Sequence, residues 1–216
     1  MEKYWETSEA NNYFERNKVT IEKLSAHNDR VMMLLDMYNL KPKSVVEIGC
    51  SNGYRLSFIH QKYQSKVTGI EPSTHAIRDG KKKYPFIKFH PCTCEKTNIR
   101  ETFDLAIIHF VLHWIDRHEL FTCIKKIDGL IEKGGFLVLG DFGTDSFVRV
   151  PYHHDTKKEA FTYKMPYWDL FLRSGNYQEI AKFRFVNDSK KLSANFTNKN
   201  MGTIVLMQKK ETFIQV

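Results

Sequence analysis

The sequence lacks long apolar runs. No stretch approaches the about 18 consecutive apolar residues of a membrane-spanning helix, and the first residues are charged and aromatic rather than apolar, unlike a secretion signal. Internal repeats and low-complexity tracts are also missing. We therefore expect a cytoplasmic protein without membrane insertion, and 216 residues suit one globular domain with a sizeable core.

Paired cysteines and long basic runs are scarce as well. No C-x-x-C pair occurs among Cys50, Cys92, Cys94 and Cys123, so we expect reduced thiols and no bound metal. No basic run exceeds Lys81-Lys82-Lys83, which disfavours a nucleic-acid partner. The net charge of +8 either attracts an anionic partner or only keeps the protein soluble, and both interpretations stay open.

The most informative stretch spans residues 45–59. An apolar β-branched run ends at Gly49, small residues continue to Gly53, and apolar residues at helical spacing follow. This order is typical of a strand, a tight turn and a helix start. Glycines let a ligand approach the backbone, and a helix N-terminus offers free N–H groups. The pattern predicts a nucleotide-binding turn, with candidate cofactor contacts at Gly49, Cys50, Ser51, Asn52 and Gly53.

Two acidic residues narrow the choice of nucleotide. Glu47 lies two places before Gly49, where a carboxylate suits the cationic tail of a ligand. Glu71 ends a second apolar strand over 66–71, and an acidic residue there accepts hydrogen bonds from ribose hydroxyls. A dinucleotide turn would read G-x-G-x-x-G, but Ser51 stands at its second glycine. An NAD-dependent oxidoreductase is therefore the less favoured alternative.

Residues 47–53 resemble the first motif, E/D-x-G-x-G-x-G, of the class I S-adenosylmethionine-dependent methyltransferases, with Ser51 replacing the middle glycine. Further segments resemble later motifs in the same order: Phe103-Asp104-Leu105-Ala106-Ile107, Leu112-His113-Trp114, and Leu130 through Val138 with its Gly134-Gly135 pair. The resemblance covers roughly residues 40–142. It implies a Rossmann-like, doubly wound α/β fold with a mostly parallel seven-stranded sheet and a reversed last strand, S-adenosyl-L-methionine as cofactor and S-adenosyl-L-homocysteine as product.

The resemblance also implies where the cofactor lies. Pro72 would follow the ribose contact at Glu71, the loop after a third strand at 86–89 would present its polar residues to adenine, and the end of the fourth strand at 103–109 would flank the methionine. These last two groups are Thr93, Cys94 and Glu95, and His109 and Phe110.

The N-terminal part has its own pattern. Residues 1–18 predict a helical lid that brings Tyr13 and Arg16 to the cofactor, or else an arm docked by its aromatic residues. Apolar residues at helical spacing predict a packing helix over 19–39. We therefore divide the chain into a lid with its packing helix, 1–40, and a methyltransferase domain, 41–216.

The segment 151–168, after a fifth strand at 136–141, mixes aromatic and polar residues as binding sites do. Candidate acceptor contacts are Tyr13, Tyr152, His153, His154, Tyr163, Lys164 and Tyr167. The segment is similar to those of bacterial methyltransferases of surface-polysaccharide and other small-molecule biosynthesis. Adjacent His153 and His154 point in different directions on a regular element, so we expect no metal there.

The acceptor decides the chemistry. A sugar hydroxyl requires a base, for which the candidates are His109, His113, His153 and His154; His113 is equally well explained as a histidine packed beside Trp114. A phosphate or carboxylate oxygen would need only cations such as Lys157, Lys158, Lys164 or Arg16. Methylases of exocyclic base amines resemble one another in an [NDS]-P-P-[YFW] tetrapeptide after the fourth strand, which is absent here.

We therefore expect an enzyme (EC 2.1.1.-) that methylates a small molecule. The expected acceptor atom is an oxygen of an anionic or sugar- or nucleotide-linked precursor in capsule or surface-polysaccharide biosynthesis. A catalytically silent protein that binds S-adenosylmethionine is the other alternative.

Overall fold

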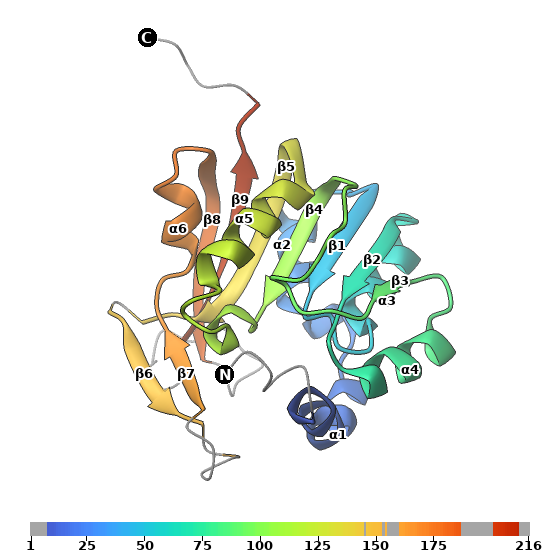
Figure 1. Ribbon diagram of the computed structural model, residues 1–216. Coiled ribbons are helices and arrows are strands. Elements are labelled where there is room, and N and C mark those ends of the chain that lie inside the picture. Colours follow the sequence, from blue (N-terminus) through green and yellow to red (C-terminus); the bar gives the residue numbers. More distant parts are fainter. Residues whose placement is uncertain (1–7, 145, 153, 155–159, 187–200, 212–216) are drawn as a thin grey trace.

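A computed structural model describes residues 8–144, 146–152, 154, 160–186 and 201–211. Its main element is a seven-stranded sheet with the order β3-β2-β1-β4-β5-β9-β8 (Figure 1). The first five strands in the chain run parallel, whereas β9 is antiparallel to both neighbours, β5 and β8. The strands are β1 (Ser44–Ile48), β2 (Lys66–Ile70), β3 (Lys88–His90), β4 (Phe103–His109), β5 (Ile131–Phe142), β8 (Tyr177–Val186) and β9 (Met201–Lys209). The predicted Rossmann-like α/β fold is confirmed.

Helices cover both faces of the sheet. On one face lie α2 (Arg30–Met37) and α3 (Tyr54–Tyr63), which bury the Val45 side of β1. On the other lie α5 (Leu120–Leu130) and α6 (Trp168–Leu172), which bury its Val46 side. Both valines are fully buried. Strands that are apolar on both faces are typical of a parallel sheet between two helical layers.

The N-terminal segment differs from the predicted single packing helix over 19–39. Instead, α1 (Glu9–Glu22) continues past residue 19, a 3₁₀ turn, η1 (Ala26–Asn28), follows, and α2 begins after Asp29. The Asp29 side chain accepts hydrogen bonds from two backbone N–H groups of the first turn of α2, at 3.0 and 3.1 Å. A capping aspartate therefore starts a new helix inside one continuous apolar pattern.

Two strands begin at residues other than the predicted ones. The third strand begins at Lys88, two residues later than predicted, and β5 begins at Ile131 rather than Phe136. Ile131 pairs with Phe103, and the register then shifts so that Leu105 pairs with Phe136. The added residues include Gly134, whose φ is +78°. The Gly134-Gly135 pair therefore lies at an irregularity inside the strand.

A two-stranded hairpin was not predicted. It consists of β6 (Val148–Pro151) and β7 (Phe161–Lys164), paired antiparallel between β5 and α6 in the chain. Figure 1 places this hairpin and α1 beyond the carboxyl ends of the parallel strands. The remaining elements are α4 (Thr74–Lys83) after β2 and a 3₁₀ turn, η2 (Leu112–Trp114), after β4.

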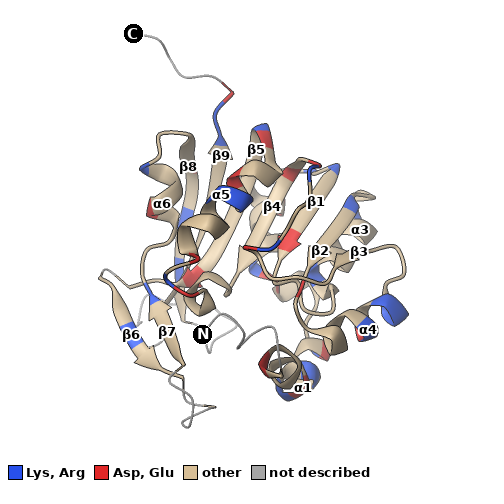
Figure 2. Cartoon of the chain, viewed as in Figure 1, with Lys and Arg blue, Asp and Glu red and all other residues tan. Residues whose placement is uncertain are grey.

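Basic residues are spread over the fold. Figure 2 shows Lys and Arg on α1, α4, α5 and β6 rather than gathered on one element. Within the described ranges, no helix is long and apolar enough to cross a membrane.

Candidate active site

A pocket of about 1130 Å³, its open mouth included, lies where β1, β2 and β4 end. Ligands of open parallel sheets bind at this edge. The residues that line it are Ala10 and Tyr13 of α1; Ile48, Gly49, Ile70, Glu71 and Pro72 around the first two strands; Cys92, Thr93, Cys94 and Glu95 after β3; Phe110, Val111, Trp114, Ile115, Asp116 and Glu119 after β4; and Ala160, Phe161 and Tyr163 at β7.

The turn after β1 requires its first glycine. Gly49 has φ +69°, and a Cβ atom there would lie 2.4 Å from Cγ2 of Val111. Ser51 also adopts a positive φ, +55°, which costs free energy for a residue with a side chain. Its backbone N–H donates to Oε2 of Glu71 at 2.9 Å. The turn therefore joins the end of β1 to the acidic residue after β2.

Glu71 is held on both of its carboxylate oxygens. Oε1 accepts a hydrogen bond from the backbone N–H of Ser73 at 2.8 Å, and Oε2 accepts the one from Ser51. The residue is 8% exposed, and burial raises the pKa of its carboxyl to about 7. Each oxygen has a second lone pair, so the fixed carboxylate can still accept hydrogen bonds from two ligand hydroxyls.

The loop after β3 supplies the next wall. Thr93, Cys94 and Glu95 all line the pocket. The Thr93 hydroxyl donates to Oε1 of Glu95, which fixes that carboxylate, and Cys94 is buried against the core. The predicted adenine contacts therefore lie in the same pocket as Glu71.

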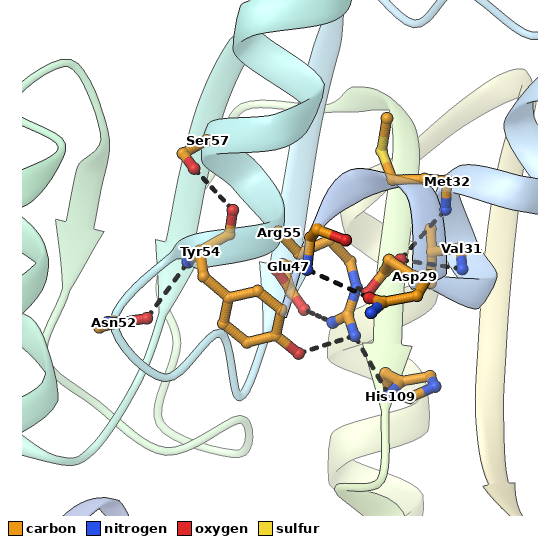
Figure 3. Close-up of polar contacts among 11 residues, drawn as sticks. Asp29, Val31, Met32, Glu47, Asn52, Tyr54, Arg55, Ser57 and His109 are labelled. Atoms are coloured by element: carbon orange, nitrogen blue, oxygen red, sulfur yellow. Dashed lines mark hydrogen bonds and ion pairs between the residues drawn. The ribbon is translucent and has the colours of Figure 1, made fainter. Parts of the chain in front are cut away.

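Glu47 has a different environment from the one predicted. Its side chain lies among α2, α3 and β4, outside the pocket lining, where Oε1 accepts a hydrogen bond from Nη1 of Arg55 (Figure 3). The Arg55 Nε atom also donates to Asp29 at 2.9 Å, and Nη2 donates to the Tyr54 hydroxyl at 2.9 Å. Buried charges need such partners, and here a protein cation occupies the position predicted for a ligand cation.

His109 belongs to the same buried network. Its Nδ1 lies 3.3 Å from Nη2 of Arg55, a donor, so Nδ1 is the acceptor, and its Nε2 is buried. Burial, followed by the nearby charges of Arg55 and Arg30, holds the pKa of His109 well below its usual range. A Cβ on Gly140 would lie 3.2 Å from Nε2. Neither ring nitrogen reaches the pocket, which disfavours His109 as a base.

His113 forms a second buried pair. Its Nδ1 lies 2.8 Å from Oδ1 of Asp141, and its backbone N–H donates to Oδ2 at 3.3 Å. The ring packs edge-on to Phe142 and tilted against Trp114, with centroids 4.8 and 4.6 Å away. Because Trp114 lines the pocket, His113 lies directly behind the wall.

The N-terminal helix α1 and the residue that follows β6 are connected by side-chain contacts. The Tyr152 hydroxyl donates to Oε1 of Glu9 at 2.7 Å and accepts from Nη2 of Arg16 at 2.8 Å. Arg16 also forms an ion pair with Glu9. These contacts join α1 to the end of β6. Arg16 and Tyr152 therefore hold these two segments, which we call the roof, together and do not line the pocket.

The other acceptor candidates are dispersed. Tyr163 lines the pocket, whereas the Tyr167 hydroxyl is buried and donates to the Tyr163 carbonyl at 2.6 Å. Lys164 lies over the Phe142 ring, with Nζ 4.1 Å from its centroid. His154 is exposed, and His153 lies outside the described residues.

The pocket therefore brings together only part of the predicted site: Tyr13, Gly49, Glu71, Pro72, Thr93, Cys94, Glu95, Phe110 and Tyr163. The turn residues Cys50, Ser51, Asn52 and Gly53 lie behind it; Cys50 is buried in the core and Asn52 donates to Asp79 at 2.8 Å. Trp114, Asp116 and Glu119 also line the pocket but were not among the predicted site residues. Their only signal in the sequence is their place after the fourth strand. Among described residues, no group of three metal-ligating side chains occurs.

Comparisons with known proteins agree with this geometry. Residues 45–135 match the family described as "Methyltransferase domain". Protein 235L of Invertebrate iridescent virus 6, which carries a methyltransferase name, is 31% identical over 98 residues, which are 45% of this chain and 36% of the viral protein. This chain therefore spans about a third of that relative.

Solved structures show the same fold over nearly the whole chain. The 1,6-didemethyltoxoflavin-N1-methyltransferase of Burkholderia thailandensis has a TM-score of 0.70 at 14% identity, covering 94% of this chain and 86% of its own. The N-methyltransferase NodS of Bradyrhizobium japonicum has a TM-score of 0.63 at 15% identity, covering 93% and 98%. Both contain S-adenosylhomocysteine. This chain therefore shares its fold with these S-adenosylmethionine-dependent methyltransferases.

Proposed function

We propose that this protein transfers a methyl group from S-adenosylmethionine to a small molecule and releases S-adenosylhomocysteine. The observation that carries the proposal is the fixed carboxylate of Glu71 beside the Gly49 turn, in the pocket at the carboxyl edge of the sheet. The match to the methyltransferase domain family supports it.

The pocket residues fit this cofactor. Glu71 would hold the ribose, the loop at Thr93–Glu95 the adenine, and Gly49 with Phe110 the methionine part. The cofactor supplies an activated methyl group on a sulfonium sulfur. The protein then has to align the acceptor with that methyl group and exclude water, and residues of α1 and β7 line the pocket in which this takes place. The closing of α1 as a lid and the division of the chain at residue 40 are parts of the proposal.

The finer expectations about the acceptor also remain proposals. The resemblance is the basis for surface-polysaccharide biosynthesis and for an oxygen acceptor. The four unpaired cysteines are the basis for a cytoplasmic setting. The cations expected to hold an anionic acceptor gain no support from the described contacts. Arg16 is bound to Glu9 and Tyr152, and Lys164 lies on Phe142; Lys157 and Lys158 fall outside the described residues. Of the candidate bases, His113 packs against Trp114 of the pocket wall.

Calorimetric titration tests the cofactor. Wild-type protein should bind S-adenosylmethionine and S-adenosylhomocysteine, and Glu71→Ala should weaken binding by about 2 kcal/mol, because charged hydrogen bonds in a closed site are lost. Glu101→Ala is the control, since Glu101 is exposed and pairs with Lys88. Absence of wild-type binding would contradict the proposal, and binding of NADH instead would favour the oxidoreductase.

A further inference from the structure

We infer that the methyl acceptor is a basic nitrogen compound, an amine or a protonatable heterocycle, in place of the anionic or sugar oxygen that the resemblance implies. The inference rests on the proposed function and names the substrate class of the same pocket. It follows from the charge of the lining, the state of two carboxylates and the aromatic walls near them.

The charge of the pocket is opposite to that of the chain. The chain carries +8, yet the charged residues that line the described pocket are all carboxylates: Glu71, Glu95, Asp116 and Glu119. No Lys or Arg lines it among the residues that the structure describes. Among the described residues, an anionic acceptor would meet these carboxylates with no cation in the lining, whereas a cation would be attracted.

Two of these carboxylates have no part in the proposed cofactor site. Glu71 faces the ribose position, and Glu95 lies at the adenine position with Thr93 as donor. Asp116 is fixed by the backbone N–H of His118, which donates to Oδ1 at 2.9 Å. The Glu119 side chain forms no hydrogen bond or ion pair with any described residue. A partly buried carboxylate in a pocket without a protein partner is available to a ligand cation.

The neighbouring walls suit the same ligand. Trp114, Phe161 and Tyr163 line the pocket. Aromatic faces attract ammonium and guanidinium groups but not anions, and the guanidinium of Arg149 already lies 3.4 Å from the Phe161 ring centroid. Arg117 lies behind this wall: its guanidinium is 4.4 Å from the Tyr163 centroid and donates to the carbonyls of Leu112 and Ile115. Its charge is therefore already engaged outside the pocket.

The reaction itself gains from such a lining. An acceptor bound in its protonated form first gives its proton to a pocket carboxylate or to water. The freed nitrogen lone pair then forms the N–CH₃ bond while the C–S bond breaks, and the bonding pair returns to sulfur. Positive charge thus moves from sulfur to nitrogen, and the nitrogen then releases a proton to a pocket carboxylate or to water. Carboxylates of Asp116 and Glu119 stabilise charge that develops on nitrogen.

The first test uses S-adenosylmethionine labelled in its methyl group and the full chain. A small-molecule extract of the organism is separated by ion exchange at about pH 5 into cationic, neutral and anionic pools, and each pool is incubated with protein. We expect incorporation at least about tenfold higher in the cationic pool. Predominant labelling of the anionic or neutral pool would overturn the inference.

Variants then test the two carboxylates. Glu119→Gln and Asp116→Asn should each raise KM for the labelled cationic acceptor by about tenfold or more, with unchanged affinity for S-adenosylmethionine; Glu101→Gln should change neither. An unchanged KM in both variants would overturn the assigned role. A wild-type protein that does not bind S-adenosylmethionine would refute the proposed function. A wild-type protein that binds it but labels none of the pools would contradict both methyl transfer and the nitrogen acceptor.

Discussion

The carboxylate of Asp141, at the end of β5, lies 2.8 Å from Nδ1 of His113 in the turn after β4. Asp141 is completely buried and also accepts the backbone N–H of Phe142 at 2.7 Å. Replacement by alanine leaves buried donors unpaired. We expect Asp141→Ala to lower the free energy of unfolding by about 3 kcal/mol, measured by urea denaturation. Glu132→Ala, on an exposed position of the same strand, should stay within about 0.5 kcal/mol; equal losses would contradict the role of the pair.

Arg55 neutralises two buried carboxylates, those of Glu47 and Asp29. Arg55→Met should destabilise the protein by about 3–5 kcal/mol, since Glu47 then loses its partner and Asp29 keeps only its hydrogen bonds from the backbone of α2. The double variant with Glu47→Gln should recover part of this loss. Urea denaturation measures both, with Lys62→Ala on the same helix as control, because its exposed pair with Asp36 is worth under about 1 kcal/mol. No recovery in the double variant would refute this account.

Glu71 should make stability depend on pH. Its pKa rises from 4.5 to about 7 on folding, so the native state retains a proton that the unfolded state has released. The unfolding free energy therefore falls as pH rises through this window, by at most about 3 kcal/mol. Glu71→Gln should remove this contribution to the dependence of the unfolding free energy on pH. Urea denaturation at about pH 5 and about pH 8 checks it, and parallel profiles for wild type and variant would contradict it.

Ser51 occupies a backbone conformation that favours glycine, with φ +55°. Ser51→Gly should raise the unfolding free energy by about 0.5–1 kcal/mol, the relief of strain exceeding the added freedom of the unfolded chain. Affinity for S-adenosylmethionine should be retained, because the backbone N–H to Glu71 remains. As a matched change, Ser57→Gly inside α3 should lower stability. Thermal denaturation decides, and a lower midpoint for Ser51→Gly would exclude strain at this turn.

Tyr152→Phe should loosen the roof without disturbing the core. The variant keeps the ring packed on Trp114, 4.5 Å between centroids, but loses the hydroxyl shared by Glu9 and Arg16. We expect faster amide hydrogen exchange in α1, corresponding to about 1–2 kcal/mol, with unchanged exchange in β4. Tyr63→Phe, whose hydroxyl contacts exposed Asp36, should leave α1 unchanged. Unaltered α1 exchange in Tyr152→Phe would show that other contacts hold the roof.

Features encoded over a few neighbouring residues were predictable. The run Phe103–His109 is almost entirely apolar and is β4 exactly as predicted. The Gly49 turn and Glu71 were found because a strand, a turn and the next strand end specify their places locally. Gly49 and Glu71 form one side of the pocket.

Features that depend on distant partners were not predictable. Nothing near Glu47 indicates that Arg55 will occupy its carboxylate together with Asp29. Trp114 at the end of η2, with Asp116 and Glu119 after it, lines the pocket. The sequence around these residues indicates only that a helix follows. Apolar periodicity likewise carried no sign of the cap at Asp29 that divides α1 from α2.

The β6–β7 hairpin is inserted between β5 and α6, whereas Gly49 and Glu71 come from the first half of the chain. Because the two parts are separate in sequence, they are free to change at different rates during evolution. In protein engineering, the same separation makes this insertion the segment to exchange between related chains. Under the proposed function, a graft should alter the choice of acceptor while the half with Gly49 and Glu71 is kept intact.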